Sequence, residues 1–407
     1  MSYERECSNL VWYCVEGSLP LYEIVFFLTN RCNQRCLTCW QWEDDFKSIG
    51  KELSDDMWTQ LLKDAILMGA KHFYIVGGGE PMVRGDLVMR LAELAKGNNM
   101  FCVLHTNGTL FRKEQMDRLI ELCWDQIIFS LDGPNPEVND SIRGKGNFNR
   151  AIQNLMYVSQ NRIKDENKNL IPDLGINFTI TNTNYSYMED MVQLAFESGC
   201  GGIHATLVQP FNKQAEQFVL EDSDIEKCKE ALAKALVKAE SLGLYHTFNS
   251  VQESFEKSKT KQFDLGQKNI SKDNLSASSF LGTYCFEPFL SLTISADGKA
   301  SPCCMFWTDR NPSVQEYSIE KIWNGEFFKG IREQLSTMCI PNVCLNCPSQ
   351  LRQRSENIRA ELKRMGERTT RNPLILVMRF FKRLQNEGFY SAWKRTKEWL
   401  YIKMGKV

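Results

Sequence analysis

The chain has 407 residues, and hydrophobic residues make up 43% of them, which is enough for one large domain with a smaller one. The formal net charge of −1 excludes a protein that binds nucleic acid through its overall charge. Residues 1–20 contain four charged residues and no long apolar run, so we expect no secretory signal there. No segment reaches the run of about 18 apolar residues that a membrane span needs.

Six short apolar runs between residues 22 and 207 predict strands, because each has the length and apolar content of a buried strand. They are Glu23–Leu28, His72–Val76, Phe101–His105, Gln126–Leu131, Gly175–Ile180 and Gly202–Leu207. Amphipathic segments between them predict helices, the first with Ser54 as its N-cap. These are Ser54–Met68, Gly85–Lys96, Lys113–Leu122, Asn149–Asn161 and Tyr187–Glu197.

Six strand–helix units in series predict a parallel α/β sheet, because parallel neighbours need crossover helices. Six units are too few for a full eight-fold barrel, which leaves a partial (β/α)6 barrel or an open doubly wound sheet. Both place ligands at the carboxyl ends of the strands. The informative motifs of this sequence lie at those ends.

The rest of the chain predicts four further segments. Residues 1–21 form an N-terminal extension, and residues 208–280 a connector with a charged helix and a polar loop. Residues 281–350 form a small second domain that opens with a hairpin. Its turn is Asp297–Gly298, where Asp297 is better explained as a turn former than as a base. Residues 351–407 form a basic helical tail.

The chain has fifteen cysteines, and nine of them gather in three places. Cysteines of a protein kept in a reducing cytosol serve metal binding or catalysis more often than disulfides. The three groups are Cys32, Cys36 and Cys39; Cys285, Cys303 and Cys304; and Cys339, Cys344 and Cys347. The remaining six are interpreted as small buried hydrophobic residues, namely Cys7, Cys14, Cys102, Cys123, Cys200 and Cys228.

The first group follows the first predicted strand directly as C-x3-C-x2-C, formed by Cys32, Cys36 and Cys39. Three thiolates on one tight loop can hold three irons of a cubane cluster and leave the fourth iron open to another ligand. A zinc site would need a fourth ligand nearby, and no His lies between residues 20 and 60. The pattern favours a [4Fe–4S] cluster.

This triplet and its position resemble the radical S-adenosylmethionine (radical SAM) superfamily, and later motifs match that family in order. Gly77–Pro81 resembles the G-G-E-P motif, which binds the methionine amino group in the family. This implies cofactor contacts for Gly78, Gly79, Glu80 and Pro81. One departure is Thr38, where the family usually has an aromatic residue or His; Trp40 is a candidate to cover the adenine instead.

The ends of the next strands carry further expected cofactor contacts. Asn107, in the T-N-G motif, and Ser130 and Asp132, in the S-L-D-G motif, suit the ribose hydroxyls of a bound nucleoside. The resemblance implies that Arg143 pairs with the methionine carboxylate, which a guanidinium fork fits well. Asn182 is a further candidate for the ribose or the methionine.

The second cysteine set resembles the SPASM appendage of this superfamily and its shorter form, twitch. The expected ligands of one auxiliary [4Fe–4S] cluster are Cys285, Cys303, Cys344 and Cys347, since the longer cysteine run of the full form is absent. A structural zinc site with four thiolates is the alternative. Cys304 and Cys339 are left over and are candidates for a substituted ligand or a hydrogen donor.

The resemblance implies cleavage of S-adenosylmethionine to a 5′-deoxyadenosyl radical, which abstracts a hydrogen atom from a substrate C–H bond. The first hypothesis is oxidation or epimerisation of a sugar-like or lipid-linked small molecule. The second is a maturase of a ribosomally made peptide, which the short segment before the first strand disfavours. The third is a non-catalytic iron–sulfur scaffold. An electron donor such as flavodoxin or ferredoxin is an expected partner.

The tail differs in charge from the body. Residues 351–407 carry 15 Lys and Arg against 5 Asp and Glu. Within residues 371–407, basic residues alternate with aromatic ones on two predicted helices, which suits peripheral contact with an anionic membrane surface. The alternative is a helical pair packed on the barrel or on a partner. The expected location is the cytoplasm, with contact at the inner membrane face, and no nucleic-acid partner is expected.

Overall fold

The computed structural model describes residues 6–8, 10, 19–42, 51–210, 212–259, 283–345, 347 and 349–370. The chain divides into two compact units. The larger unit holds residues 21–264 and 291–327, and the smaller one holds residues 1–20, 265–290 and 328–407.

The larger unit is built on a nine-stranded sheet with the order β11-β10-β1-β2-β3-β4-β7-β8-β9. Its six central strands are β1 (Glu23–Phe26), β2 (His72–Ile75), β3 (Phe101–Thr106), β4 (Gln126–Ser130), β7 (Asp173–Ile180) and β8 (Gly202–Leu207). All neighbours among them pair in parallel. They stand in chain order, without the reversal that defines a doubly wound sheet. The partial (β/α)6 barrel is therefore confirmed, and the open alternative is excluded.

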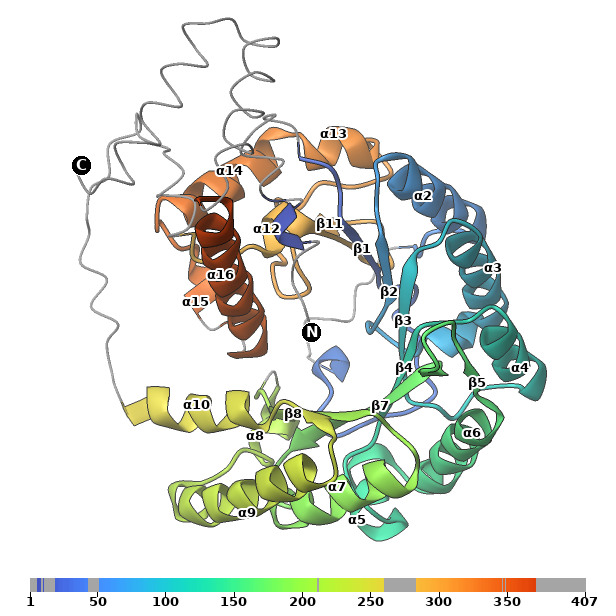
Figure 1. Ribbon diagram of the computed structural model, residues 1–407, viewed down its shortest axis with the longest axis vertical. Coiled ribbons are helices and arrows are strands. Elements are labelled where there is room, and N and C mark those ends of the chain that lie inside the picture. Colours follow the sequence, from blue (N-terminus) through green and yellow to red (C-terminus); the bar gives the residue numbers. More distant parts are fainter. Residues whose placement is uncertain are drawn as a thin grey trace, which may run out of the picture. The chain divides into compact units, whose positions relative to one another are not determined.

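Helices of this unit surround the strands on the outer face of the curved sheet (Figure 1). They are α2 (Asp55–Leu67), α3 (Gly85–Gly97), α4 (Lys113–Glu121), α5 (Pro136–Arg143), α6 (Asn147–Asn161), α7 (Met188–Glu197), α8 (Lys213–Glu216), α9 (Asp222–Ser241), α10 (Phe248–Lys259) and α13 (Ile319–Trp323). Ser54 caps α2 as predicted, since its side chain accepts a hydrogen bond from Met57 N. The 3-10 helices are η1 (Trp40–Trp42), η3 (Pro81–Arg84) and η4 (Tyr185–Tyr187), and β5 (Ile163–Lys164) pairs with β6 (Leu170–Ile171).

Apolar side chains between the strands and the helices form the core. The ring of Phe26 on β1 lies 4.6 Å from Trp58 of α2 and 5.2 Å from Phe73 of β2, measured between centroids. All three side chains are fully buried. Tilted and edge-on contacts of this kind are the favoured packing of aromatic rings. This layer fixes β1, and with it the loop that follows the strand.

The predicted hairpin is present, but it extends the barrel sheet. Strand β10 (Ser291–Ile294) pairs in parallel with β1, and β11 (Ala300–Ser301) pairs with β10 in antiparallel fashion. Gly298, with φ of +86°, allows the turn. On the opposite edge, β9 (Tyr245–His246) pairs with β8. Two segments outside residues 22–207 therefore lengthen the sheet.

The smaller unit is helical where it is described. It contains α12 (Glu287–Leu290), most of α14 (Glu326–Ser336), α15 (Asn342–Leu345) and α16 (Ser349–Thr370). Arg332 of α14 donates to Pro288 O over 2.8 Å, and Cys7 Sγ lies 3.5 Å from Ile358 O of α16. The first part of the predicted basic tail is thus the helix α16. The predicted helix pair in residues 371–407 lies outside the described residues.

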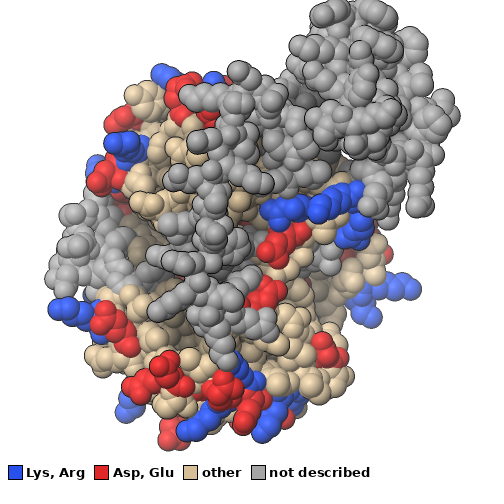
Figure 2. Space-filling view, turned by 90° about the vertical axis from the view of Figure 1, so that its left-hand side faces the viewer, with Lys and Arg blue, Asp and Glu red and all other residues tan. Residues whose placement is uncertain are grey.

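Charged side chains are mixed on the surface. On the parts of the face in Figure 2 that described residues form, Lys and Arg are interspersed with Asp and Glu. This agrees with the formal net charge of −1. Among the described residues, no helix combines the length and apolar content that crossing a bilayer requires.

Candidate active site

The three cysteines of the first motif lie on the loop between β1 and η1. Contacts from distant segments close this loop. Leu37 N donates to Ile142 O of α5 over 2.9 Å, and Asn212 Nδ2 donates to Cys39 O over 3.0 Å. Asn212 also caps α8, since its Oδ1 accepts from Ala215 N. The loop is therefore held by the segments after β4 and after β8.

Burial shapes the chemistry of the three thiols. It raises the pKa of Cys36 to about 12, and it also raises the pKa values of Cys32 and Cys39. The Arg143 charge opposes this shift at each thiol. Because thiols must deprotonate to bind metal, buried thiols that lie close together suit a site where cationic iron supplies the balancing charge.

The described residues contain no group of three or more His, Cys, Asp or Glu side chains that could hold a single metal ion. A cubane cluster makes a different demand, because each cysteine binds its own iron. The donor set of three thiols on one loop fits a [4Fe–4S] cluster in this respect.

Gly78 and Gly79 pack directly against the cysteine loop. Gly79 N donates to Thr29 O over 2.6 Å, and a Cβ placed on Gly79 would lie only 1.9 Å from Arg31 O. Gly78 has φ of +89°, and its added Cβ would lie 2.7 Å from Thr29 O. The glycines therefore allow the close approach of two backbone segments. In this structure the close neighbour is the backbone of the cysteine loop.

Glu80 lies buried at the carboxyl edge of the sheet, next to Pro81 at the start of η3. Its Oε1 accepts from Thr106 Oγ1 over 2.7 Å and from Met82 N over 3.0 Å, and its Oε2 accepts from Asn107 N over 2.6 Å. Burial raises the pKa of Glu80, and these hydrogen bonds oppose the shift. The carboxylate is thus fixed in position by three donors.

Asn107 contacts the cysteine loop. Its Nδ2 donates to Asn33 Oδ1 over 2.9 Å and lies 3.9 Å from Cys32 Sγ. Its Oδ1 accepts from Thr109 N. The amide is therefore placed to donate to a sulfur of the cysteine loop, and its expected contact with a nucleoside stays a prediction.

Asp132 and Arg143 form a buried ion pair. Arg143 Nε lies 2.7 Å from Asp132 Oδ2, and the two side chains are 13% and 1% exposed. Asp132 Oδ1 accepts from Thr179 N over 2.8 Å. The other N–H groups of Arg143 make no hydrogen bond to any residue that the structure describes, so the guanidinium keeps donors for another anion. The expected ribose contact of Asp132 stays a prediction.

Two further candidates end neighbouring strands. Ser130 is half-buried at the end of β4. Asn182 follows β7 and donates through Nδ2 to Gln217 O over 2.9 Å. Its buried Oδ1 accepts no hydrogen bond from the described part of the chain, which leaves an acceptor for a ligand.

The sequence analysis missed a polar cluster on the concave face of the barrel. His105 Nδ1 of β3 lies 3.0 Å from Asn177 Nδ2 of β7, although β4 lies between these strands. His204 of β8 acts electrostatically on His105. Burial lowers the pKa of each histidine to about 4, so both imidazoles are neutral near pH 7. Polar residues within otherwise apolar strands were the signal available in the sequence.

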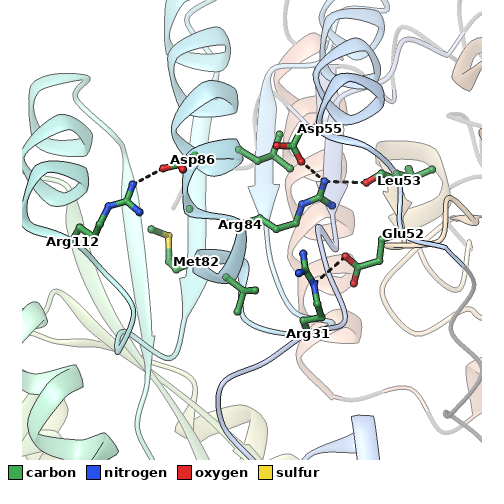
Figure 3. Close-up of a pocket in the computed structure, with 11 residues that line it drawn as sticks. Arg31, Glu52, Leu53, Asp55, Met82, Arg84, Asp86 and Arg112 are labelled. Carbon is green, nitrogen blue, oxygen red and sulfur yellow. Dashed lines mark hydrogen bonds and ion pairs between the residues drawn. The ribbon is translucent and has the colours of Figure 1, made fainter.

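A cavity of about 460 Å³ lies beside the base of the cysteine loop (Figure 3). Arg84 is nearly buried there and donates to Leu28 O, to Leu53 O and to Asp55. Arg31 pairs with Glu52, which also accepts from Thr29 Oγ1 over 2.8 Å. A third pair joins Arg112 and Asp86. Each guanidinium pairs with a carboxylate, so we interpret the ion pairs that line this cavity as contacts that hold the cysteine loop in place.

The cysteines of the second and third groups are divided between the two units. Cys285, Cys339, Cys344 and Cys347 belong to the smaller unit, and Cys303 and Cys304 to the larger one. Burial raises the pKa of Cys285 to about 12, and the nearby Cys347 adds to the shift. Burial also raises the pKa of Cys344, whereas Cys339 is exposed. The ligand set and the two hydrogen-donor candidates stay predictions.

Comparisons with known proteins agree with this geometry. The family model described as the radical SAM superfamily matches residues 26–206, and the SPASM model, an iron–sulfur cluster-binding domain, matches residues 285–348. The mycofactocin maturase MftC of Mycolicibacterium smegmatis is 31% identical over 46% of this chain and 45% of its own length. An AdoMet-dependent heme synthase of Methanosarcina barkeri is 24% identical over 80% of this chain and 90% of its own. The match thus spans less than half of MftC.

Solved structures share the fold. SuiB of Streptococcus suis, bound to its precursor peptide SuiA, matches with a TM-score of 0.58 at 15% identity, over 86% of this chain and 74% of that one. The anSMEcpe structure with bound AdoMet matches with a TM-score of 0.58 at 16% identity, over 81% of this chain and 86% of that one. The two matched domains imply a [4Fe–4S] cluster with S-adenosylmethionine and an auxiliary iron–sulfur cluster.

Proposed function

Because this chain belongs to the SPASM-containing subgroup of the radical SAM superfamily, we propose that it oxidises or epimerises an organic substrate at a C–H bond. Cys32, Cys36 and Cys39 would hold the first cluster, which when bound would supply the electron for reductive cleavage of S-adenosylmethionine, the chemistry that abstracts a hydrogen atom from the substrate. The observation that carries the proposal is the central place of Arg143. Arg143 ends α5, whose Ile142 O accepts a hydrogen bond from Leu37 N of the cysteine loop, and its Nε lies 2.7 Å from Asp132 Oδ2.

The methionine part of the cofactor needs a partner for each of its charges. In this proposal the fixed carboxylate of Glu80 accepts from the ammonium, and Arg143 donates to the carboxylate. Both groups of the ligand sit on one carbon, so the proposal requires Glu80 and Arg143 to lie close together. Asp132 orients the Arg143 guanidinium through the ion pair at Nε. The cysteine loop presents its thiolates beside this pair.

The residues on the concave face of the barrel suit a substrate that carries a polar, uncharged group. His105 and Asn177 are neutral donors and acceptors on β3 and β7, two strands whose carboxyl ends carry cofactor candidates, and the neutral His204 lies on the neighbouring strand β8. Such groups suit the hydroxyls of a sugar-like or lipid-linked small molecule. The alternative substrate is a ribosomally made peptide, which is supported by the similarity to the maturase MftC and to SuiB, whose structure contains a precursor peptide. The heme synthases, aligned over most of their length, support a small molecule.

The test of the proposal separates the two cysteine sets. Anaerobically reconstituted protein should hold about eight irons, and the variant with Cys32, Cys36 and Cys39 replaced by Ala should hold about four. That variant should make no 5′-deoxyadenosine from S-adenosylmethionine and dithionite. Cys123→Ala, at an exposed cysteine outside both sets, is the control. Formation of 5′-deoxyadenosine by the triple variant would refute the radical assignment.

The substrate classes can be separated by isotope transfer. Deuterated lipid-linked saccharides and deuterated precursor-like peptides would be offered to the wild-type protein, and 5′-deoxyadenosine would be examined for deuterium. Transfer from the saccharides supports the first hypothesis, and transfer from the peptides replaces it with the second.

A further inference from the structure

We infer that helix α16 is part of the auxiliary cluster site and that Ser355 is a positioning residue that sets the reduction potential of this cluster. The inference rests on the proposed role of Cys285 as a ligand. Ser355 Oγ lies 3.8 Å from Cys285 Sγ, a hydrogen-bond distance for sulfur. Both residues belong to the smaller unit.

Three side chains of α16 hold the short segment that contains Cys285. Arg359 Nη2 donates to Thr283 O over 2.8 Å, two residues before the cysteine. Arg354 Nη1 donates to both carboxylate oxygens of Glu287 over 3.1 Å, two residues after it. Ser355 and Arg359 are four residues apart and so lie on one face of the helix. The helix therefore fixes the backbone on either side of the thiol.

The direction of the Ser355 hydroxyl follows from its second contact. Its oxygen accepts a hydrogen bond from Phe286 N over 3.1 Å. A hydroxyl has one hydrogen to donate, and this accepted bond leaves that hydrogen available for Cys285 Sγ. Ser355 is buried, so water does not compete for the bond. The serine is thus a dedicated donor to the sulfur.

A donor at this position affects redox chemistry through charge. Reduction adds negative charge to an iron–sulfur cluster, and hydrogen bonds to its sulfurs stabilise that charge and raise the potential. Glu287, two residues after Cys285, acts in the opposite direction, since its carboxylate places a negative charge near the sulfur. Arg354 offsets this carboxylate in a nearly buried ion pair. The helix therefore supplies both a donor to the sulfur and a counter-charge.

The test isolates the auxiliary cluster in protein whose Cys32, Cys36 and Cys39 are replaced by Ala. Potentiometric titration followed by electron paramagnetic resonance gives the midpoint potential. We expect Ser355→Ala to shift it to a more negative value at unchanged iron content, and Ser355→Thr, which keeps the hydroxyl, to restore it. Ser318→Ala is the matched control, because Ser318 caps α13 and lies in the other unit.

Each outcome decides the inference. An unchanged potential in Ser355→Ala, or a shift in Ser355→Thr equal to that of Ser355→Ala, overturns it. A large fall in the Tm of the protein in Ser355→Ala, with Ser355→Thr at a shifted potential, assigns a structural role only and also overturns it. Cys285→Ala is the companion variant. If it keeps the full auxiliary iron, the proposed ligand role fails, which is a different result from an unchanged potential in Ser355→Ala.

Discussion

Replacing Asp132 by Asn removes the charge that faces Arg143 and leaves the shape of the side chain. The pair is buried, with Arg143 Nε 2.7 Å from Asp132 Oδ2. Removing one partner of a buried pair costs about 3–5 kcal/mol, because the other charge stays desolvated without compensation. For a unit of roughly 280 residues, an unfolding entropy of about 2.1 cal/mol/K per residue converts this cost into a Tm lower by about 5–8 °C.

The assay is thermal unfolding of the cluster-free protein followed by circular dichroism. The matched control is Asp56→Asn, since Asp56 pairs with Arg90 over 3.3 Å at the surface and is 97% exposed. Exposed pairs contribute about 0–1 kcal/mol, so this Tm should fall by less than about 2 °C. S-adenosylmethionine should raise the Tm of reconstituted Asp132→Asn more than that of wild type, because its carboxylate replaces the lost charge. Equal Tm losses in the two Asn variants would refute the reasoning.

Three further predictions concern other parts of the two sites. Asn212→Ser keeps the cap of α8 but loses the donor to Cys39 O, so we expect faster iron loss from the first cluster in air, whereas Asn98→Ser, at an exposed helix end, should match wild type. His105→Gln should reduce the loss of stability between about pH 6.5 and pH 4. The pKa of His105 in the folded protein is about 4, so in this range the unfolded chain binds a proton that the native state excludes. Equal pH profiles of urea unfolding for His105→Gln and wild type would contradict this. Replacing Cys344 and Cys347 by Ala should remove the auxiliary iron. Formation of 5′-deoxyadenosine should be preserved, because radical generation needs only the first cluster. An unchanged iron content would show that neither cysteine is a ligand.

The elements of the barrel were predictable because their signals are local. The six strands and the N-cap of Ser54 occur close to their expected positions. Each strand has enough apolar residues to require burial, and each needs a crossover helix to reach its parallel neighbour. The same local pattern predicted the hairpin after residue 281. It did not predict that β10 pairs with β1, since this register joins residues more than 260 positions apart.

Long-range contacts also explain what sequence reasoning missed at the two cysteine sites. Asn212 reaches Cys39 O across 173 residues, and Ser355 reaches Cys285 across 70. Neither residue belongs to a recognisable motif, because its role depends on a contact that forms only when the chain is folded. The charge of residues 351–407 predicts a separate basic tail that includes residues 351–370. In the structure they form a helix whose side chains hold the segment around Cys285.

Asp132 illustrates the difference between a motif and a geometry. The S-L-D-G pattern places a carboxylate at the end of a strand, and a carboxylate there can turn toward a ligand or back toward the protein. The Asp132 carboxylate accepts a hydrogen bond from Thr179 N and forms an ion pair with Arg143, and the side chain is almost fully buried. A buried carboxylate with these partners holds the guanidinium in place, because turning it toward a ligand would break both its hydrogen bond with Thr179 N and its ion pair with Arg143. We therefore propose an indirect role, in which Asp132 acts on the cofactor through Arg143.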